Sequence, residues 1–185
     1  TFGLTLLFSI YLQSVKQMTA QKAGFILMIS PILMTIFAPI FGRLSDKYSS
    51  FKLSLGGVGL CLIATIIATR INQHSPQWHI YTLFSFMGLG FAMFASPNMN
   101  LIMSSVNHKF LSLASSMAAM MRTIGMVLGL IFINIFISLF IGKEMIGINN
   151  IDAYIKAMNS TAQSFSILLG IGLIFGLFSM KMKRS

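Results

Sequence analysis

The chain has 185 residues, of which 56% are hydrophobic and only 9% are charged, and its mean hydropathy is +0.84. Soluble globular domains carry roughly 25% charged residues, so this composition excludes a soluble domain and indicates a protein that lies in lipid. The net charge of +10 would suit nucleic acid. However, the cations lie in short connections between apolar runs, so we expect no nucleic-acid partner.

Six apolar runs approach or reach the ~20 residues that a helix needs to cross a hydrocarbon core. A closed barrel would need alternating strands of roughly ten residues, whereas these runs are continuous. The sequence therefore predicts an all-α fold, a polytopic transmembrane helical bundle that forms one domain over residues 1–185. The expected spans are, in chain order, 1–13, 24–42, 53–70, 79–103, 112–141 and 162–180.

The first expected span is short and begins inside an apolar run, with no targeting segment before it. We therefore expect this chain to be the C-terminal part of a longer membrane protein whose N-terminal half is missing here. The second expected span carries Pro31 and Pro39. Each proline lacks a backbone donor, so we expect bends of the kind tolerated where helices line a cavity.

The connection after the second span reads FGRLSDKYSSFKLS, residues 41–54, and places one carboxylate, Asp46, among three cations. Judged alone, Asp46 is an exposed charge near the start of the third span. A carboxylate there is worth about 0.3–1 kcal/mol through the helix dipole. Ser49 or Ser50 could cap the same helix.

Small residues recur at helical spacing in the later spans, and we expect them to let helices approach closely in lipid. The third span also holds the single cysteine, Cys61, so no disulfide can form within the chain. The glycines concerned are Gly56, Gly57 and Gly59 in the third span, Gly88 and Gly90 in the fourth, Gly125 and Gly129 in the fifth, and Gly172 and Gly176 in the sixth.

Arg122 is the ionisable residue that lies deepest within an expected span. It lies about eleven residues into its helix, or roughly 16 Å at 1.5 Å per residue, near the middle of a ~30 Å hydrocarbon core. A charge left in lipid costs at least ~2.5–3.5 kcal/mol, so we expect Arg122 to point into the bundle, where it belongs to a translocation pathway or is held by backbone carbonyls. Asn98 and Asn100 in the fourth span are candidate partners on that pathway.

The distribution of lysine and arginine favours a cytoplasmic C-terminus, because cytoplasmic loops carry the excess of these residues. Seven cations would then lie inside, namely Arg43, Lys47, Lys52, Lys109, Lys181, Lys183 and Arg184. Five would lie outside, namely Lys16, Lys22, Arg70, Lys143 and Lys156. The acids Glu144 and Asp152 reduce the net charge of the outer side further.

Motifs for catalysis are absent from the sequence. It has neither a G-x-x-x-x-G-K-[ST] nor a G-x-G-x-x-G loop to hold a nucleotide phosphate. Its three histidines, His74, His79 and His108, lack metal-ligand spacing, and no serine stands in a nucleophile elbow. We therefore expect that the chain is not an enzyme and holds no cofactor or metal.

The segment GRLSDK at 42–47 resembles the G-x-L-x-D-[RK] signature of the major facilitator superfamily, which lies between the second and third helices of a six-helix half. Gly42, Leu44, Asp46 and Lys47 match it. Serines at positions 49 and 50 stand where a glycine and an arginine usually follow. The resemblance implies that the chain is the C-terminal six-helix half of a major facilitator fold.

Residues 10–135 are similar, more narrowly, to the drug/proton antiporter branch with fourteen spans. The matching residues are Tyr11, Leu12, Gln13, Gly24, Pro31, Gly42, Asp46, Gly88, Gly90, Pro97, Ser115, Arg122 and Gly125. The similarity departs at NHKFLSLASS, where Leu111 or Ser112 replaces a common glycine.

This resemblance implies a secondary active transporter that works by alternating access, and most simply a proton-coupled multidrug exporter in the bacterial inner membrane. Asp46 would help to close the cytoplasmic side, and substrate would bind between the halves near the midplane. The implied partners are the lipid bilayer, the missing half, protons, and small hydrophobic or cationic drug-like substrates. No acid lies within an expected span, so the titrating carboxylate belongs in the missing half. Two alternatives stay open: a permease for a defined small solute, and a non-transporting membrane anchor or scaffold.

Overall fold

The computed structural model describes residues 2–142 and 150–182, and these form helices and connections with no strand. The helices are α1 (Phe2–Ile10), continued by a π-helix (Tyr11–Val15), α2 (Ala20–Leu27), α3 (Ile29–Lys47), α4 (Ser50–Thr69), α5 (Gln77–Ser104), a 3-10 turn (His108–Phe110), α6 (Leu111–Ile141) and α7 (Ile151–Met182). Five stretches are long and apolar enough to cross a membrane: Ala20–Lys47, Ser50–Thr69, Gln77–Ser104, His108–Ile141 and Ile151–Met180. A shorter apolar stretch covers Phe2–Val15. The prediction of an all-helical membrane bundle is confirmed.

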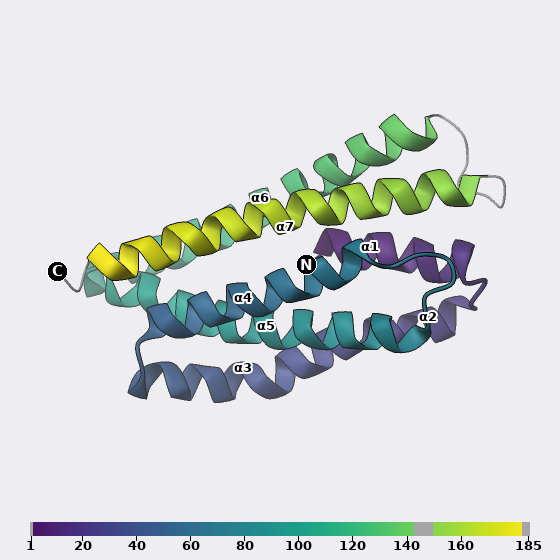
Figure 1. Ribbon diagram of the computed structural model, residues 1–185. Helices are drawn as coiled ribbons and strands as arrows, with labels where there is room; N and C mark the ends of the chain where they lie inside the picture. The colour runs from purple at the N-terminus through teal and green to yellow at the C-terminus, as the bar shows by residue number, and fades with distance from the viewer. Residues whose placement is uncertain (1, 143–149, 183–185) are drawn as a thin grey trace.

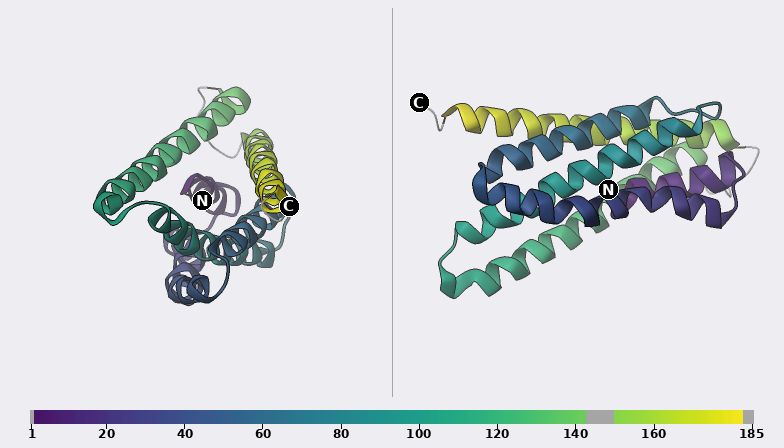
Figure 2. Two further views of the ribbon diagram at one scale, coloured as in Figure 1. Left: turned by 90° about the vertical axis from the view of Figure 1, so that its left-hand side faces the viewer. Right: turned by 90° about the horizontal axis from the view of Figure 1, so that it is seen from below.

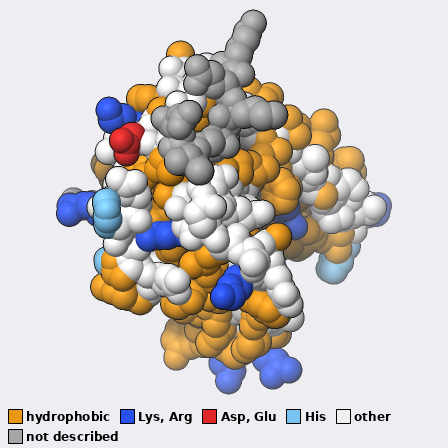
Figure 3. All heavy atoms as spheres, turned by 90° about the vertical axis from the view of Figure 1, so that its right-hand side faces the viewer, with side chains coloured by type: hydrophobic (Ala, Val, Ile, Leu, Met, Phe, Trp, Pro, Cys, Tyr) orange, Lys and Arg blue, Asp and Glu red, His pale blue; other side chains and the backbone are white. Residues whose placement is uncertain are grey.

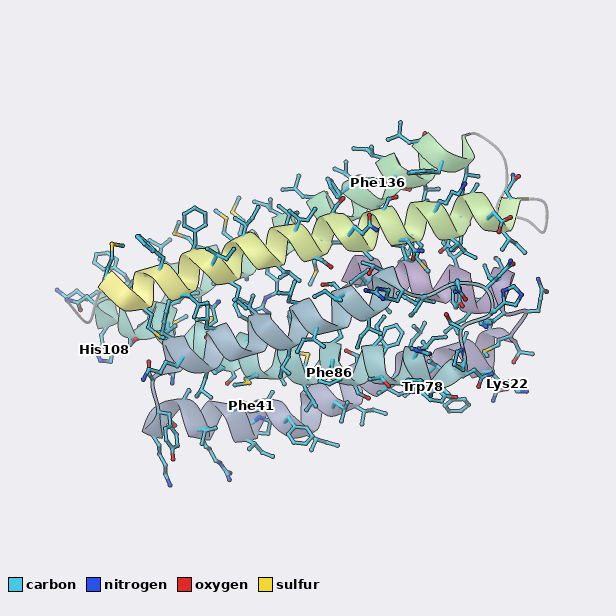
Figure 4. All side chains as sticks on the ribbon, in the orientation of Figure 1. Lys22, Phe41, Trp78, Phe86, His108 and Phe136 are labelled. Atoms are coloured by element: carbon cyan, nitrogen blue, oxygen red, sulfur yellow. The ribbon has the colours of Figure 1, made fainter. Side chains whose placement is uncertain are left out.

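The connections alternate between the two ends of the bundle. The α3–α4 and α5–α6 connections lie at the end that holds the C-terminus, here called the C-terminal end, and the α1–α2 and α4–α5 connections lie at the opposite end (Figure 1). His108 lies at the C-terminal end, whereas Lys22 and Trp78 lie at the opposite end (Figure 4). The described cations assigned to the inner side, Arg43, Lys47, Lys52 and Lys109, lie on elements at the C-terminal end, and those assigned to the outer side, Lys16, Lys22, Arg70 and Lys156, lie at the opposite end. Lys143, Glu144, Lys183, Arg184 and the side chain of Lys181 lie outside the described part of the chain.

The second span is one helical stretch, Ala20–Lys47, in which α2 (Ala20–Leu27) is followed directly by α3 (Ile29–Lys47). Met28 keeps helical angles, its amide donates to the carbonyl oxygen of Gly24 at 3.0 Å, and its own carbonyl oxygen accepts from the amide of Ile32 at 3.0 Å. One helical bond is missing here, because Pro31 has no amide hydrogen to donate to the carbonyl of Leu27 four residues earlier. Pro39 lies inside α3, and the helix continues through it.

Glycines bring α4 and α5 into close contact, as the sequence predicted. A methyl group on Gly57 would lie 2.6 Å from the carbonyl oxygen of Gly90, and one on Gly90 would lie 2.8 Å from the amide nitrogen of Cys61. A methyl group on Gly88 would lie 2.6 Å from the carbonyl oxygen of Ser30 in α3. These three glycines allow α3 and α4 to pack closely on α5.

We expect Gly57→Ala to destabilise the fold by about 1–3 kcal/mol, the usual cost of overpacking, because the added methyl group meets backbone atoms that cannot rotate away. The measurement is the midpoint of thermal unfolding of the purified protein in detergent. Gly59→Ala is the matched control, since its methyl group would lie at an ordinary 3.5 Å from Leu173 Cδ1. Equal midpoints for the two variants would contradict the close packing of α4 on α5.

The core lies around α1, which runs inside a ring formed by α4, α5, α6 and α7, while α3 lies outside this ring (Figure 2, left). Phe8 packs edge-on against Tyr11 and Phe84, with ring centroids 5.8 and 5.6 Å apart. The hydroxyl of Tyr154 in α7 donates a hydrogen bond of 2.6 Å to the carbonyl oxygen of Leu7. All four aromatic side chains are fully buried. These contacts fix α1 between α5 and α7.

α7 begins eleven residues before the expected span of 162–180. Its first three turns carry polar residues, which lower the hydropathy, but Tyr154, Met158 and Thr161 are fully buried. Their spacing of four and three residues defines one face of a helix. The helix is therefore longer than the apolar run, because one of its faces packs on the core.

α6 is largely exposed along its length. Of its residues, only Ile133 and Ile141 are buried by the described part of the chain. An apolar helix that remains exposed in this way faces lipid or another part of a larger protein.

Candidate functional site

The α3–α4 connection is held against α5 by a group of polar contacts. Asn100 donates from Nδ2 to Asp46 Oδ1 and to Ser45 Oγ, both at 3.0 Å. Ser45 Oγ in turn donates to the carbonyl oxygen of Gly42 at 2.7 Å. A methyl group on Gly42 would lie 2.8 Å from Ser96 Oγ in α5. We call these five residues the α3–α5 contact.

Asp46 lies in the last turn of α3, close to the start of α4. A carboxylate at the C-terminal end of its own helix meets the negative end of the helix dipole, which is unfavourable. Ser49 makes no capping bond, and Ser50 donates from Oγ to the carbonyl oxygen of Ser45 at 3.2 Å instead of capping α4. The expected serine cap is therefore wrong, and helix stability does not explain the carboxylate.

The other matching residues of the signature have separate surroundings. Leu44 is half-buried, and its carbonyl oxygen accepts from the amide of Tyr48 at 2.9 Å. Lys47 is exposed. The structure thus brings Asp46 to Asn100 and Gly42 to Ser96 in α5, whereas Lys47 is exposed.

The two asparagines of α5 do not bind Arg122. Asn100 donates to Ser45 and Asp46 at the C-terminal end of the bundle, so this candidate partner of Arg122 bonds elsewhere in the described structure. Asn98 is half-buried on the same stretch of α5. Among residues 2–142 and 150–182, no hydrogen bond or ion pair joins either asparagine to Arg122.

Arg122 lines a pocket of about 340 Å³ between five helices of the bundle. The walls come from α1, α4, α5, α6 and α7, and they include Phe91, Phe94 and Phe165. The side chain of Arg122 is exposed in the described part of the chain, and its guanidinium group has no hydrogen-bond or ion-pair partner there. Arg122 therefore faces a hollow of this bundle, although no partner within the chain satisfies it.

The four glycines expected to pack α6 and α7 behave differently from one another. A methyl group on Gly176 would lie against Leu55 Cδ1, so Gly176 packs closely on α4. Methyl groups on Gly125, Gly129 and Gly172 would meet no atom within 4 Å among the described residues. Close packing at these three glycines stays a prediction that needs a partner beyond the described residues. Gly125 and Gly129 line the pocket instead.

A second polar contact, at the opposite end, joins the first helix to the α4–α5 connection. Lys16 donates from Nζ to the carbonyl oxygens of Gln73 and Ser75, both at 2.8 Å. The hydroxyl of Tyr11 donates to the backbone carbonyl oxygen of Asn72 at 2.6 Å. The helix adopts the π form over Tyr11–Val15, directly before Lys16. Sequence reasoning counted Lys16 only as a loop charge, because nothing in the sequence links it to carbonyl groups 57 and 59 residues away.

This end of the bundle shows lysine, arginine and histidine side chains around hydrophobic flanks (Figure 3). The imidazole ring of His79 stacks on Trp78 with centroids 3.8 Å apart. Aromatic and basic side chains of this kind are typical of the end of a membrane span, where the chain leaves the hydrocarbon for the headgroups.

The sequence of this chain is similar to those of known membrane transporters. The profile of the Major Facilitator Superfamily matches residues 1–130. The riboflavin transporter RibZ of Clostridioides difficile is 25% identical over 179 residues, which make up 97% of this chain and 39% of that protein. The lincomycin resistance protein LmrB of Listeria innocua is 30% identical over 92 residues, which make up 50% of this chain and 20% of that protein.

An uncharacterized MFS-type transporter of Bacillus subtilis, YhcA, is 29% identical over 112 residues, or 60% of this chain and 21% of that protein. No solved structure matches. The chain thus spans well under half the length of these curated relatives. The profile covers most of the chain, including the signature at 42–47 and all residues of the α3–α5 contact, and the chain belongs to the Major Facilitator Superfamily.

Proposed function

We propose that the intact protein is a secondary active transporter that works by alternating access, and that this chain is its C-terminal six-helix half. The α3–α5 contact is the observation that carries this proposal. Asp46 is exposed and disfavoured by the dipole of its own helix, yet Asn100 holds it in one orientation by a bond of 3.0 Å. A fixed, exposed carboxylate at the end of the bundle suits a contact with a second half.

The proposal also covers the direction of transport and the energy that drives it. The relatives include one protein named for riboflavin transport and one named for lincomycin resistance. We propose proton-coupled efflux of several small, drug-like molecules in the bacterial inner membrane, with the C-terminus in the cytoplasm and fourteen spans in the whole protein. Neither described acid, Asp46 or Asp152, lies deep within a span, so the carboxylate that exchanges protons would belong to the other half.

Membership of a transporter family agrees with the expectation that the chain is not an enzyme. It also disfavours the alternative of a membrane scaffold. A permease for a defined solute differs from an exporter in direction and in selectivity, and transport measurements separate the two.

The test uses inverted membrane vesicles from cells that express the full-length gene. With the vesicle interior made acidic, an exporter driven by protons accumulates labelled riboflavin or lincomycin, and a protonophore abolishes the uptake. A permease for a defined solute would instead carry one of the two compounds into intact cells. If neither compound moved in a protein-dependent way in either preparation, the proposal would be contradicted and the non-transporting scaffold would be favoured.

A further inference from the structure

The pocket beside Arg122 has walls suited to a flat aromatic ligand. Its sides include four phenylalanines, Phe2, Phe91, Phe94 and Phe165, and the flexible thioethers of Met87 and Met126. Aromatic rings favour stacked and edge-to-face contacts with other rings, and methionine adapts to irregular shapes. Its volume of about 340 Å³ lies at the lower end of the range typical of small-molecule sites, roughly 300–1,000 Å³.

The same pocket offers hydrogen-bond donors but few acceptors. The guanidinium of Arg122 carries five N–H donors and no acceptor, and none of these donors has a partner in the described part of the chain. The hydroxyl proton of Thr65 is already used, because Oγ1 donates to the carbonyl oxygen of Leu62 at 2.9 Å. The pocket therefore favours a ligand that accepts hydrogen bonds over one that donates them.

The charges around the pocket also favour a ligand that is negative or accepts hydrogen bonds. Arg122 is the one charged residue among its described lining residues. Asp46 lies at the C-terminal end and is bound to Asn100, and Asp152 lies in the first turn of α7. A positive charge beside apolar walls attracts an anion and repels a cation.

The surface of α6 leaves room for the ligand next to this charge. Gly125 and Gly129 follow Arg122 along the helix and line the pocket, and a methyl group on either would meet no atom of the described residues within 4 Å. A side chain at either position would extend into the open space. Because these two glycines have no side chain, the helix surface next to the guanidinium is flat.

We propose that this pocket binds a planar aromatic molecule through an anionic group, or a carbonyl-rich edge, held by Arg122, and that it discriminates against cations. The proposal rests on the proposed transport function and names its substrate class. The sequence left hydrophobic and cationic substrates both open. The proposal excludes the cationic ones and keeps hydrophobic substrates with a negative or hydrogen-bond-accepting edge.

The test uses two fluorescent probes with the same aromatic body, 8-anilinonaphthalene-1-sulfonate and the uncharged N-phenyl-1-naphthylamine. They are titrated into the intact protein in phosphatidylcholine nanodiscs, and the signal of empty nanodiscs is subtracted. Loss of a hydrogen-bonded charge pair weakens binding by about tenfold or more. We expect Arg122→Gln to weaken binding of the sulfonate probe by that factor and to change binding of the uncharged probe less than about twofold.

Arg122→Lys keeps the charge but loses the planar donor fork, so it is expected to fall between the wild type and Arg122→Gln. The matched control is Arg70→Gln, which removes the same charge from an exposed residue at the end of α4, outside the pocket. It should leave both probes unaffected. Retained binding of the uncharged probe shows that Arg122→Gln is folded.

Three results would overturn the proposal: unchanged binding of the sulfonate probe in Arg122→Gln, an equal loss for both probes, or tighter binding of the cation ethidium than of the sulfonate probe to the wild type. Nanodiscs that also contain phosphatidylglycerol test for a lipid headgroup. If that lipid displaces the sulfonate probe from the wild type, Arg122 binds lipid and the proposal is wrong. Charge-selective binding without any transport would instead contradict the proposed function alone.

Discussion

Asp46→Asn is expected to lower the transport rate of the intact protein at least about tenfold, while the amount of protein in the membrane stays within about twofold of the wild type. The substitution keeps the oxygen that accepts from Asn100 Nδ2 at 3.0 Å, so the α3–α5 contact survives and only the charge is lost. A change of about 1.4 kcal/mol between two conformations alters their ratio tenfold, and a contact that closes one side biases that ratio directly. Initial transport rates in vesicles, normalised to protein amount, provide the measurement.

Two further variants separate charge from orientation. Asn100→Ala keeps the carboxylate but removes the donor that orients it, so we expect an intermediate transport rate. Asp152→Asn, the matched control, removes an exposed carboxylate from the first turn of α7 and should leave transport unchanged. If Asp46→Asn transported as fast as the wild type at equal amount, Asp46 would have no role beyond its local contact.

Lys16→Met is expected to destabilise the protein by about 2 kcal/mol or more, because its two bonds of 2.8 Å to the carbonyl oxygens of Gln73 and Ser75 are lost together. Hydrogen bonds to charged groups contribute about 1.5–3 kcal/mol each when buried, and the partial exposure of Lys16 reduces this value. The thermal midpoint of the purified protein should fall by about 4–8 °C on the usual scaling for chains of this size.

Lys22→Met is the matched control, because Lys22 lies at the same end of the bundle (Figure 4) and its exposed side chain makes no described bond. Lys16→Arg should retain most of the stability, since a guanidinium can donate to the same carbonyls. Equal midpoints for Lys16→Met and Lys22→Met would show that the α4–α5 connection does not depend on Lys16.

The helices could be predicted from the sequence because lipid imposes a simple condition: a spanning segment must be apolar and long enough. The close contacts of Gly57, Gly88 and Gly90 could also be predicted as a class. The start of α7 was missed because polar residues such as Asp152 and Lys156 lower the hydropathy there. The four- and three-residue spacing of Tyr154, Met158 and Thr161 was the signal that could have revealed it.

The pairing within the site could not be read from the sequence. Asn100 and Asp46 are 54 residues apart, and only the packing of α3 on α5 brings them together. Gly125 and Gly129 were expected to bring another helix close to α6, but these small residues here border the pocket that Arg122 lines. A small-residue stripe looks identical in sequence whether it meets a helix or leaves a space.

If the intact protein works by alternating access, as proposed, the hollow beside Arg122 opens to each side of the membrane in turn. The most direct measurement is the reactivity of Gly125→Cys, in a Cys61→Ser background, towards a thiol reagent that cannot cross the membrane, applied in separate experiments to right-side-out and inverted vesicles. We expect labelling from both sides. We also expect Asp46→Asn to increase labelling from the side on which the α3–α4 connection lies and to decrease it from the other side. Labelling from one side alone, unchanged by Asp46→Asn, would contradict alternating access.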